Sequence, residues 1–222
     1  NHYVTGHRKD RDRNMKMNKN RVQWLALMGV VGTIFYFLHV ILGEINYPGY
    51  HPLAQAVSDL TAATAPSREI ASACSTVYAF FTVAACTLLC VFYQGRVNKV
   101  FRLGIYLFAI MEWTSAVGYT LFPLSGSGYA GTFQDVMHMV VTAFVVLLSI
   151  ASMILIAVGC FKSKVHKQLG IFTLAVLGIM TLGSIATGVV PLGYFGFAER
   201  LSVYSVVMYS AALSLFTFRY PI

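Results

Sequence analysis

The sequence has few charged residues. Aspartate, glutamate, lysine and arginine together make up 11% of its 222 residues, whereas 57% are hydrophobic and the mean hydropathy is +0.68. A soluble domain carries about twice that share of charge. This scarcity excludes an ordinary soluble domain and predicts an integral membrane protein built as one domain.

Acidic residues are scarcer than basic ones, which leaves a formal net charge of +8. Seven of the sixteen lysines and arginines precede Trp24, and most of the others fall in short loops. This distribution is typical of the cytoplasmic face of a membrane protein, where basic residues meet anionic lipid. The expected partner is therefore membrane lipid, and a nucleic-acid partner is not expected.

Cysteine is also scarce, and its spacing predicts no disulfide framework. The four residues, Cys74, Cys86, Cys90 and Cys160, all lie in apolar segments. Cys86 and Cys90 share a helix face, but two thiols alone make a poor metal site. Packing is the favoured interpretation of these cysteines.

Six long apolar segments are present, and each is long enough to cross a bilayer as a helix. Their approximate ranges are 24–42, 70–93, 103–122, 133–161, 169–190 and 199–218. They predict an all-α membrane protein, a six-transmembrane-helix bundle over residues 22–219. Residues 1–21, polar and of mixed charge, are predicted to form a disordered basic cytoplasmic arm.

The basic residues also predict the orientation of the bundle. Fourteen lysines and arginines gather on one side if both termini and the loops after the second and fourth segments share it, which leaves Arg68 and Arg200 opposite. Both termini are therefore expected to be cytoplasmic in a multi-pass protein of the cell membrane.

The segment 47–70 between the first two spans is the longest polar stretch after the arm. It reads YPGYHPLAQAVSDLTAATAPSREI, and its polar residues alternate with apolar ones such as Leu53, Val57 and Leu60. This pattern predicts turns and a short amphipathic or re-entrant helix on the non-cytoplasmic face.

Most ionisable residues of the spans and loops map to that same face, where a membrane protein places groups that line a cavity or pair with one another. Asp135 and His138 are three residues apart on one helix face, so the aspartate can orient the histidine for proton transfer or metal binding. Ser58 is a candidate nucleophile, with Asp59 beside it and His51 as a further base. The alternatives are a helix cap and hydrogen bonds that anchor loops.

Four other residues are candidate substrate-binding groups. Arg68 and Arg200 can hold an anionic head group, and Glu199 suits a helix start by its charge. Glu112 falls midway along the third span, where a carboxyl group is a functional candidate by default. The cofactor remains open: a divalent metal such as zinc would need at least three of Asp59, Asp135, His138 and His51 around one ion.

Several short motifs resemble the "domain of unknown function 998" family of prokaryotic six-span membrane proteins. They are Pro48-x-Tyr50, Val57-Ser58-Asp59-Leu60, Pro66, Phe122-Pro123, His138 and Gly196-x-x-Glu199-Arg200. The resemblance covers most of residues 24–218 and rests on the order and spacing of the motifs. It implies the six-helix fold and a shared site formed by the motif residues, and it supplies no reaction.

Three functions fit the sequence. The leading hypothesis is an enzyme that acts on a lipid or lipid-linked substrate near the outer leaflet, as a hydrolase or an acyl or head-group transferase. The second is a non-enzymatic lipid-binding or membrane-organising protein. The third is a proton-coupled small-molecule transporter that uses Glu112 as its relay.

Overall fold

The computed structural model describes residues 21–163 and 166–219. The predicted arm, residues 1–21, lies outside this part except for Arg21. The described residues are helical and contain no strand. The α-helices are α2 (Arg21–Ala26), α3 (Met28–Ile45), α4 (Arg68–Phe92), α5 (Lys99–Leu121), α6 (Phe133–Ser163), α7 (Lys167–Ala186) and α8 (Phe195–Arg219). Two short 3-10 helices, η1 (Val57–Thr61) and η2 (Leu192–Tyr194), lie in loops.

Six of the helical segments are long and apolar enough to cross a membrane, which confirms the prediction of a six-helix membrane-type protein. The first combines α2 with α3, and the last combines η2 with α8. Three boundaries differ from the prediction by about four residues. The third helix begins at Lys99 rather than near Leu103, and Asn98 caps it there. The fifth helix ends at Ala186 rather than near Val190, and the sixth begins at Phe195 rather than at Glu199. Apolar composition continues through both regions, so hydropathy alone does not locate these ends.

Local sequence accounts for two of the helix starts. The Asn98 side chain accepts a hydrogen bond from the backbone N–H of Phe101 at 2.9 Å and so caps α5. Thr132 and Asp135 form a reciprocal capping box at the start of α6. In this motif Asp135 N–H donates to the Thr132 hydroxyl at 3.2 Å, and Thr132 N–H donates to the Asp135 carboxylate at 3.3 Å.

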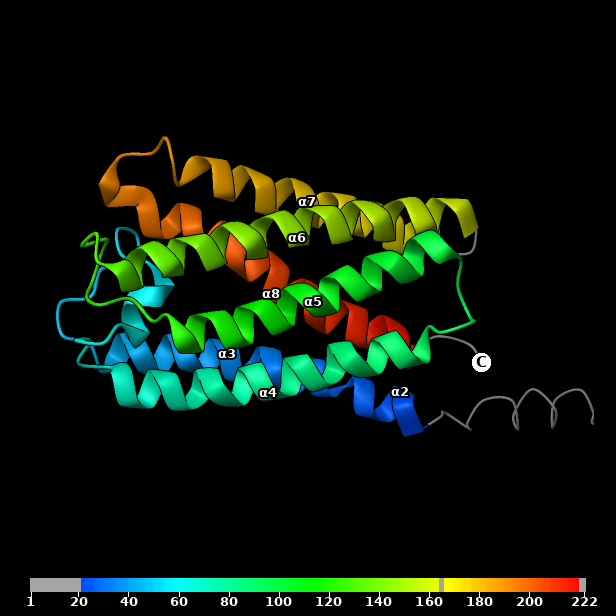
Figure 1. Ribbon diagram of the computed structural model, residues 1–222, viewed down its shortest axis with the longest axis horizontal. Helices are drawn as coiled ribbons and strands as arrows, with labels where there is room; N and C mark the ends of the chain where they lie inside the picture. Colours follow the sequence, from blue (N-terminus) through cyan, green and yellow to red (C-terminus); the bar gives the residue numbers. More distant parts are fainter. Residues whose placement is uncertain (1–20, 164–165, 220–222) are drawn as a thin grey trace, which may run out of the picture.

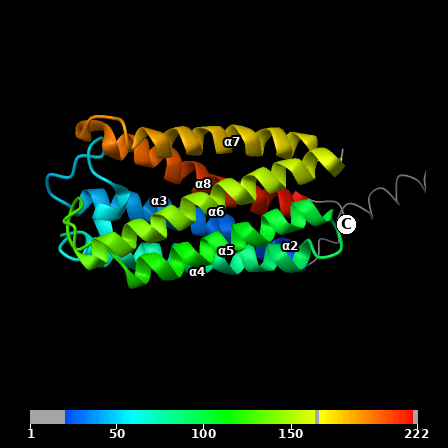
Figure 2. The ribbon, with the colours of Figure 1, turned by 45° about the horizontal axis from the view of Figure 1, so that its top comes forward.

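The six long helices form a closed ring. Each of α3 to α8 contacts the next along the chain, and α8 returns to contact α3. The helices run lengthwise beside one another in both views (Figures 1 and 2). Helix α4 also contacts α8 across the ring. Side chains on the inner faces of helices that are not neighbours can therefore meet inside the ring.

The two ends of this bundle differ in what they carry. The first and last described residues lie at one end, with the loop 93–98, the end of α6 and the start of α7; we call this the terminal end (Figure 1). The loops 46–67, 122–132 and 187–194 lie at the other end, which we call the motif end (Figure 1). The motif residues predicted from the sequence, apart from Glu112, lie at or near the motif end.

Two hydrophobic clusters fill the interior. The larger belongs to the terminal half and includes Phe92, Phe101, Phe108, Met153 and Leu213. The smaller belongs to the motif half and contains Tyr36, Val40, Val57, Leu60, Ala71 and Val207, with further tyrosines packed against it. Apolar side chains thus dominate one half of the interior, and tyrosines take much of the other.

Candidate functional site

The loop 46–67 folds over the motif end as turns and the short helix η1. Val57, Asp59 and Leu60 of η1 are buried, and Leu60 lies directly against Gly43 of α3. The Ser67 hydroxyl donates a hydrogen bond to the Leu60 carbonyl at 2.8 Å and ties η1 to the start of α4. Val57 and Leu60 of this loop therefore pack onto the helices below it, whereas Leu53 is exposed.

Arg200 ties this loop to α8 through a set of hydrogen bonds, which we call the clasp. Its Nη1 donates to the carbonyl oxygens of Pro52 at 2.6 Å and Gln55 at 2.8 Å. Its Nη2 donates to the Glu44 carboxylate at 3.0 Å and to the Tyr50 hydroxyl at 2.7 Å. Because one guanidinium is a rigid fork of donors, it can hold the end of α3, the loop and α8 together. Arg200 pairs with Glu44, and not with Asp59 or Asp135.

Tyr50 completes the clasp. Its hydroxyl accepts the hydrogen bond from Arg200 and donates one to the Ala56 carbonyl at 2.7 Å. Burial raises the pKa of the Tyr50 hydroxyl well above its usual range. The hydroxyl therefore remains neutral and keeps the proton that it donates to Ala56.

Gly196 allows the loop to approach α8 closely. A Cβ atom at this position would collide with the backbone carbonyl oxygens of Gln55 and Pro52, which are the two that Arg200 binds. The neighbouring backbone is tied as well, since Phe197 N–H donates to the Leu53 carbonyl at 3.0 Å. The same loop therefore depends on both residues. Gly196 lets the loop backbone approach α8, and Arg200 binds the loop carbonyl oxygens.

Glu199 lies beneath the start of η1. Its Oε2 accepts a hydrogen bond of 2.6 Å from the backbone N–H of Val57. A carboxylate in this place satisfies a donor at the helix start that has no partner within the helix. Glu199 and Arg200 thus hold the same loop through different atoms.

Asp59 joins the first loop to the loop 122–132. It is 2% exposed and accepts hydrogen bonds of 3.0 Å from the Ser127 hydroxyl and from Gly128 N–H. The Gln55 side chain donates to the same Ser127 hydroxyl at 2.9 Å. A backbone bond of 2.7 Å from Ala63 N–H to the Leu124 carbonyl reinforces this junction.

Asp135 organises the loop 122–132 from the start of α6. Its carboxylate accepts hydrogen bonds from the Ser125 N–H at 2.8 Å, the Ser125 hydroxyl at 2.9 Å and the Ala130 N–H at 3.2 Å. These come in addition to the capping box with Thr132. Loop groups therefore occupy the Asp135 carboxylate, and among the described residues it accepts no hydrogen bond from His138, which the sequence suggested it could orient.

His138 instead bonds to the end of α5. Its Nδ1 is 2.8 Å from the Phe122 carbonyl oxygen. Because a carbonyl only accepts, Nδ1 carries the proton and Nε2 has the free lone pair. The ring lies 4.8 Å from the Tyr119 ring. His138 is therefore oriented, and its basic nitrogen remains available.

The other predicted loop residues are less constrained. Ser58 is partly exposed in η1, and its hydroxyl makes no hydrogen bond to another described residue. His51 is exposed, and its backbone N–H donates to the Gln55 side chain at 2.8 Å. Arg68 is exposed at the start of α4, and its Nη1 donates to the Ala63 carbonyl at 3.3 Å.

Electrostatic interactions and ring contacts relate polar side chains of five helices below the loops. Tyr119 of α5 interacts electrostatically with Glu199 of α8 and with Tyr36 of α3, although these helices are not neighbours in the ring. His138 of α6 joins this group through its contact with Tyr119, and Tyr78 of α4 joins through its ring contact of 5.0 Å with Tyr36.

Glu112 lies deeper in the same interior, near the middle of α5. It is 3% exposed, and it interacts electrostatically with the Tyr78 hydroxyl and the Cys86 thiol of α4. No hydrogen bond from another described side chain or backbone group reaches its carboxyl. Glu112 is therefore remote from the loop network and belongs to the floor of the polar interior.

The described residues contain no group of three or more histidine, cysteine, aspartate or glutamate side chains arranged to hold a metal ion. Asp59 and Asp135 are surrounded by loop donors, and His51 lies on the exposed part of the loop. This donor set therefore does not fit the zinc site that the sequence left open.

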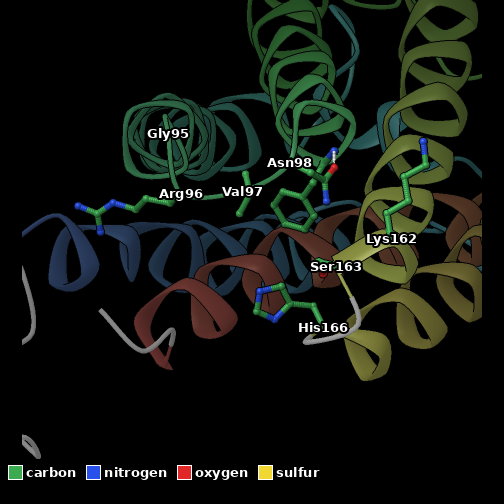
Figure 3. Close-up of a pocket in the computed structure, with 8 residues that line it drawn as sticks. Gly95, Arg96, Val97, Asn98, Lys162, Ser163 and His166 are labelled. Carbon is green, nitrogen blue, oxygen red and sulfur yellow. Dashed lines mark hydrogen bonds between the residues drawn. The ribbon is translucent and has the colours of Figure 1, made fainter.

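A cavity of about 340 Å³ lies at the terminal end, far from all of these residues. Arg96, Asn98, Lys162 and His166 are among its lining residues, and the Arg96 and Lys162 side chains extend away from each other (Figure 3). Because its charged groups do not converge and no motif residue lines it, we do not assign the candidate site there.

The motif residues therefore lie at one level of the bundle. They are connected through the loops and do not form a single cluster of direct contacts. Sequence reasoning missed Glu44 and Tyr50 as partners of Arg200, and it missed the interior tyrosines Tyr36, Tyr78 and Tyr119. The Pro-x-Tyr turn was a signal for Tyr50. The interior tyrosines had no such signal, because tyrosine is also common at membrane interfaces.

The ring of six membrane-type helices with a loop-covered polar interior defines a class of multi-pass helical proteins. The chain belongs to the family described as "Protein of unknown function (DUF998)", whose model matches residues 30–215. This confirms the resemblance seen in the sequence. No curated protein and no solved structure matches the chain.

Proposed function

We propose that this protein acts on a lipid or lipid-linked substrate as a hydrolase or as an acyl or head-group transferase. One observation carries the proposal: below η1, His138 is held by Phe122 and lies against the Tyr119 ring, while Tyr119 and Tyr36 both interact electrostatically with Glu199. A substrate with a polar group and an apolar chain matches a site of this kind between apolar walls.

His138 is the proposed general base. Its Nδ1–H bond to Phe122 fixes the ring and leaves Nε2 to accept a proton from the attacking group, which is the Ser58 hydroxyl or a water molecule. The protonated ring then returns the proton to the leaving group. Asp59 and Asp135 stabilise the imidazolium through their charges. Glu199 and the exposed residues Arg68 and His51 are proposed to bind the substrate from the loop side.

Lipid turnover tests this function. The purified protein is reconstituted in nanodiscs with a total lipid extract, and the lipids are compared by mass spectrometry over time. We expect His138→Gln to slow turnover by about 10²-fold or more, because glutamine can still donate to Phe122 but cannot act as a base. His166→Gln at the terminal end is the matched control. Unchanged turnover in His138→Gln would remove the proposed base.

The proposed orientation places the motif end outside the cytoplasm of a cell-membrane protein, with both termini inside. The excess of basic residues at the terminal end supports it. The loop 46–67, with Val57 and Leu60 packed onto the helices, would then lie at the outer membrane surface. In a cysteine-free background, a membrane-impermeant thiol reagent should label Tyr129→Cys in intact cells and leave Arg96→Cys unlabelled. The opposite pattern would invert the topology and move the site to the inner leaflet.

A non-enzymatic lipid-binding or membrane-organising function is the second candidate. It is favoured because the charged groups of Asp59, Asp135 and Arg200 all hold loops in place. Under this function, lipid would copurify with the protein and remain chemically unchanged in the turnover experiment. The Ser58→Ala and His138→Gln variants would then retain the same bound lipid as the wild type.

A further inference from the structure

We propose that Tyr119 of α5 is a positioning residue for His138, and that Thr142 of α6 holds Tyr119 in place for this role. Tyr119 restrains the imidazole ring and stabilises it when it is protonated. This role rests on the proposed function, in which His138 is the general base. The restraint on the ring is a property of the protein alone, so it can be measured without knowledge of the substrate.

Two contacts from the end of α5 hold the His138 ring. The Phe122 carbonyl oxygen lies 2.8 Å from Nδ1, at one edge of the imidazole. The Tyr119 ring lies against the imidazole, with the two ring centroids 4.8 Å apart and the ring planes inclined at 40°. A single hydrogen bond leaves a ring able to rock about that bond, whereas a second ring packed against it limits the motion. Tyr119 therefore supplies a restraint that the bond to Phe122 alone does not.

The hydrogen bonds of Thr142 determine which way the Tyr119 hydroxyl donates. The Thr142 hydroxyl donates to the His138 carbonyl oxygen at 2.9 Å, and the Tyr119 hydroxyl lies 3.1 Å from the same Thr142 oxygen. Because a hydroxyl has one proton, Thr142 has none left to donate to Tyr119. Tyr119 is therefore the donor, and its side chain is tied to the turn of α6 that follows His138.

A tyrosine that donates its proton suits a neighbour that becomes positively charged. Donation increases the electron density on the phenol oxygen and in the ring, and the face of such a ring attracts cations. The separation of 4.8 Å between the centroids is within the roughly 6 Å over which this attraction acts. The imidazolium that forms when His138 takes a proton is thus stabilised beside Tyr119 more than the neutral imidazole is.

Close packing of α5 on α6 brings the two rings together. A Cβ atom at Gly118 would lie 2.6 Å from one methyl carbon of Val141 and 2.8 Å from the other, so only glycine fits without a shift. Gly118 and Val141 directly precede Tyr119 and Thr142 in the sequence. The glycine therefore lets the helices approach at the level where the Tyr119 hydroxyl reaches Thr142.

Capping of α5 does not by itself account for this arrangement. Helix α5 ends at Leu121, and the last carbonyl groups of a helix have no partner within it. The Gln134 side chain donates to the Leu121 carbonyl at 2.9 Å, just as His138 donates to that of Phe122. An amide is therefore sufficient to cap this helix end, and capping requires neither an imidazole nor a tyrosine beside it.

Nuclear magnetic resonance of the wild-type protein is the first test. The full-length protein is labelled at histidine and tyrosine and measured in detergent micelles, and the His138 signals are identified by their absence from His138→Gln. We expect one neutral form that is protonated at Nδ1, with through-space contacts between the ring protons of His138 and Tyr119. A neutral ring protonated at Nε2, or the absence of these contacts, would overturn the inference before any variant of Tyr119 is made.

Variants of Tyr119 separate positioning from general packing. Tyr119→Leu should broaden or split the His138 ring signals and slow lipid turnover by about 3–10-fold, because the restraint and the cation attraction are both lost. Tyr119→Phe keeps an aromatic ring and should retain most of the turnover. Tyr106→Leu, at a partly buried tyrosine in the terminal half of α5, is the matched control and should change neither readout. Equal losses in Tyr119→Phe and Tyr119→Leu would overturn the role of the ring.

Thr142→Val tests the anchor of the tyrosine. It should also broaden the His138 ring signals, because the Tyr119 hydroxyl loses its acceptor. Thr120→Val is the matched control: Thr120 is exposed, and its hydroxyl likewise donates to a carbonyl one turn back, that of Ala116 at 2.7 Å. Equal broadening in the two threonine variants would contradict a specific role for Thr142.

The failure of the positioning role and the failure of the proposed function give different results. Sharp and unchanged His138 signals in Tyr119→Leu would overturn the positioning role, even if His138→Gln abolishes turnover. Broadened signals in Tyr119→Leu, together with normal turnover in His138→Gln, would support the restraint on the ring and remove its proposed use as a base.

Discussion

The tyrosine hydroxyls of the two halves of the bundle differ in their hydrogen bonding. In the terminal half, the Tyr93 hydroxyl pairs with that of Thr217 and the Tyr209 hydroxyl with that of Thr173, both at 2.8 Å. In the motif half, the Tyr36 and Tyr78 hydroxyls make no hydrogen bond to another residue that the structure describes. The two terminal-half tyrosines are thus paired internally, whereas of the interior tyrosines Tyr36, Tyr78 and Tyr119 in the motif half only Tyr119 is paired, with Thr142 at 3.1 Å.

This difference separates a structural half from a half that can bind. Groups without partners are costly in a membrane interior, and they are kept where a ligand, an ion or water meets them. The contrast also bears on transport. A transporter needs a path through both halves, and in this conformation Phe92, Phe108 and Leu213 fill the terminal half.

The largest expected effect on stability is in the terminal half. Phe108→Ala should lower the free energy of unfolding by about 3–4 kcal/mol, because it leaves a cavity in close-packed apolar surroundings. Equilibrium unfolding in mixed micelles measures this change. Tyr36→Phe, in the motif half, should cost less than about 1 kcal/mol because it breaks no internal hydrogen bond. Similar losses in both variants would contradict the division into two halves.

The clasp at the motif end should be the next most sensitive feature. Arg200→Ala should cost about 3 kcal/mol, because Glu44 and two loop carbonyls lose their donor in a partly buried place. Limited proteolysis should then cut the loop 46–67 before the helices unfold. Arg219→Ala, at the exposed end of α8, is the matched control and should leave both readouts unchanged. An Arg200→Ala protein that resists proteolysis like the wild type would show that the loop does not need the clasp.

The smallest of the three effects concerns the approach of the loop to α8. Gly196→Ala should cost about 1–3 kcal/mol, because its methyl group must displace the carbonyls of Pro52 and Gln55. Gly193→Ala lies three residues earlier, where a Cβ atom meets nothing within 4 Å, and should be neutral. Thermal unfolding of the pair measures the difference. Equal Tm values would mean that the loop can move away from α8 without loss.

The helices could be predicted from the sequence because apolar runs of bilayer length leave few alternatives. The midway position of Glu112 and the shared helix of Asp135 and His138 followed from residue counting alone. These features depend on local composition and helical periodicity, which a single sequence contains.

The partners of the charged residues could not be predicted in the same way. Several acidic residues at the membrane level of Arg200 are possible ion-pair partners in the sequence. The pairing with Glu44 depends on how α3 and α8 pack. Asp135 is a different case, since Thr132-x-x-Asp135 is a capping-box pattern visible in the sequence. The helical spacing to His138 favours a histidine partner, but a carboxylate at a helix start bonds first to the backbone donors beside it.

The clasp also has a consequence for the order of events during synthesis. Glu44 and Arg200 are 156 residues apart, so at a rate of 5–20 residues per second roughly 8–30 s separate their synthesis. The loop 46–67 is made early, yet the arginine that binds it arrives with the last helix. Throughout that interval the loop has no clasp, and chains that stop before Arg200 would present it to quality-control proteases. The Arg200–Glu44 pair can therefore form only after the last helix has been made.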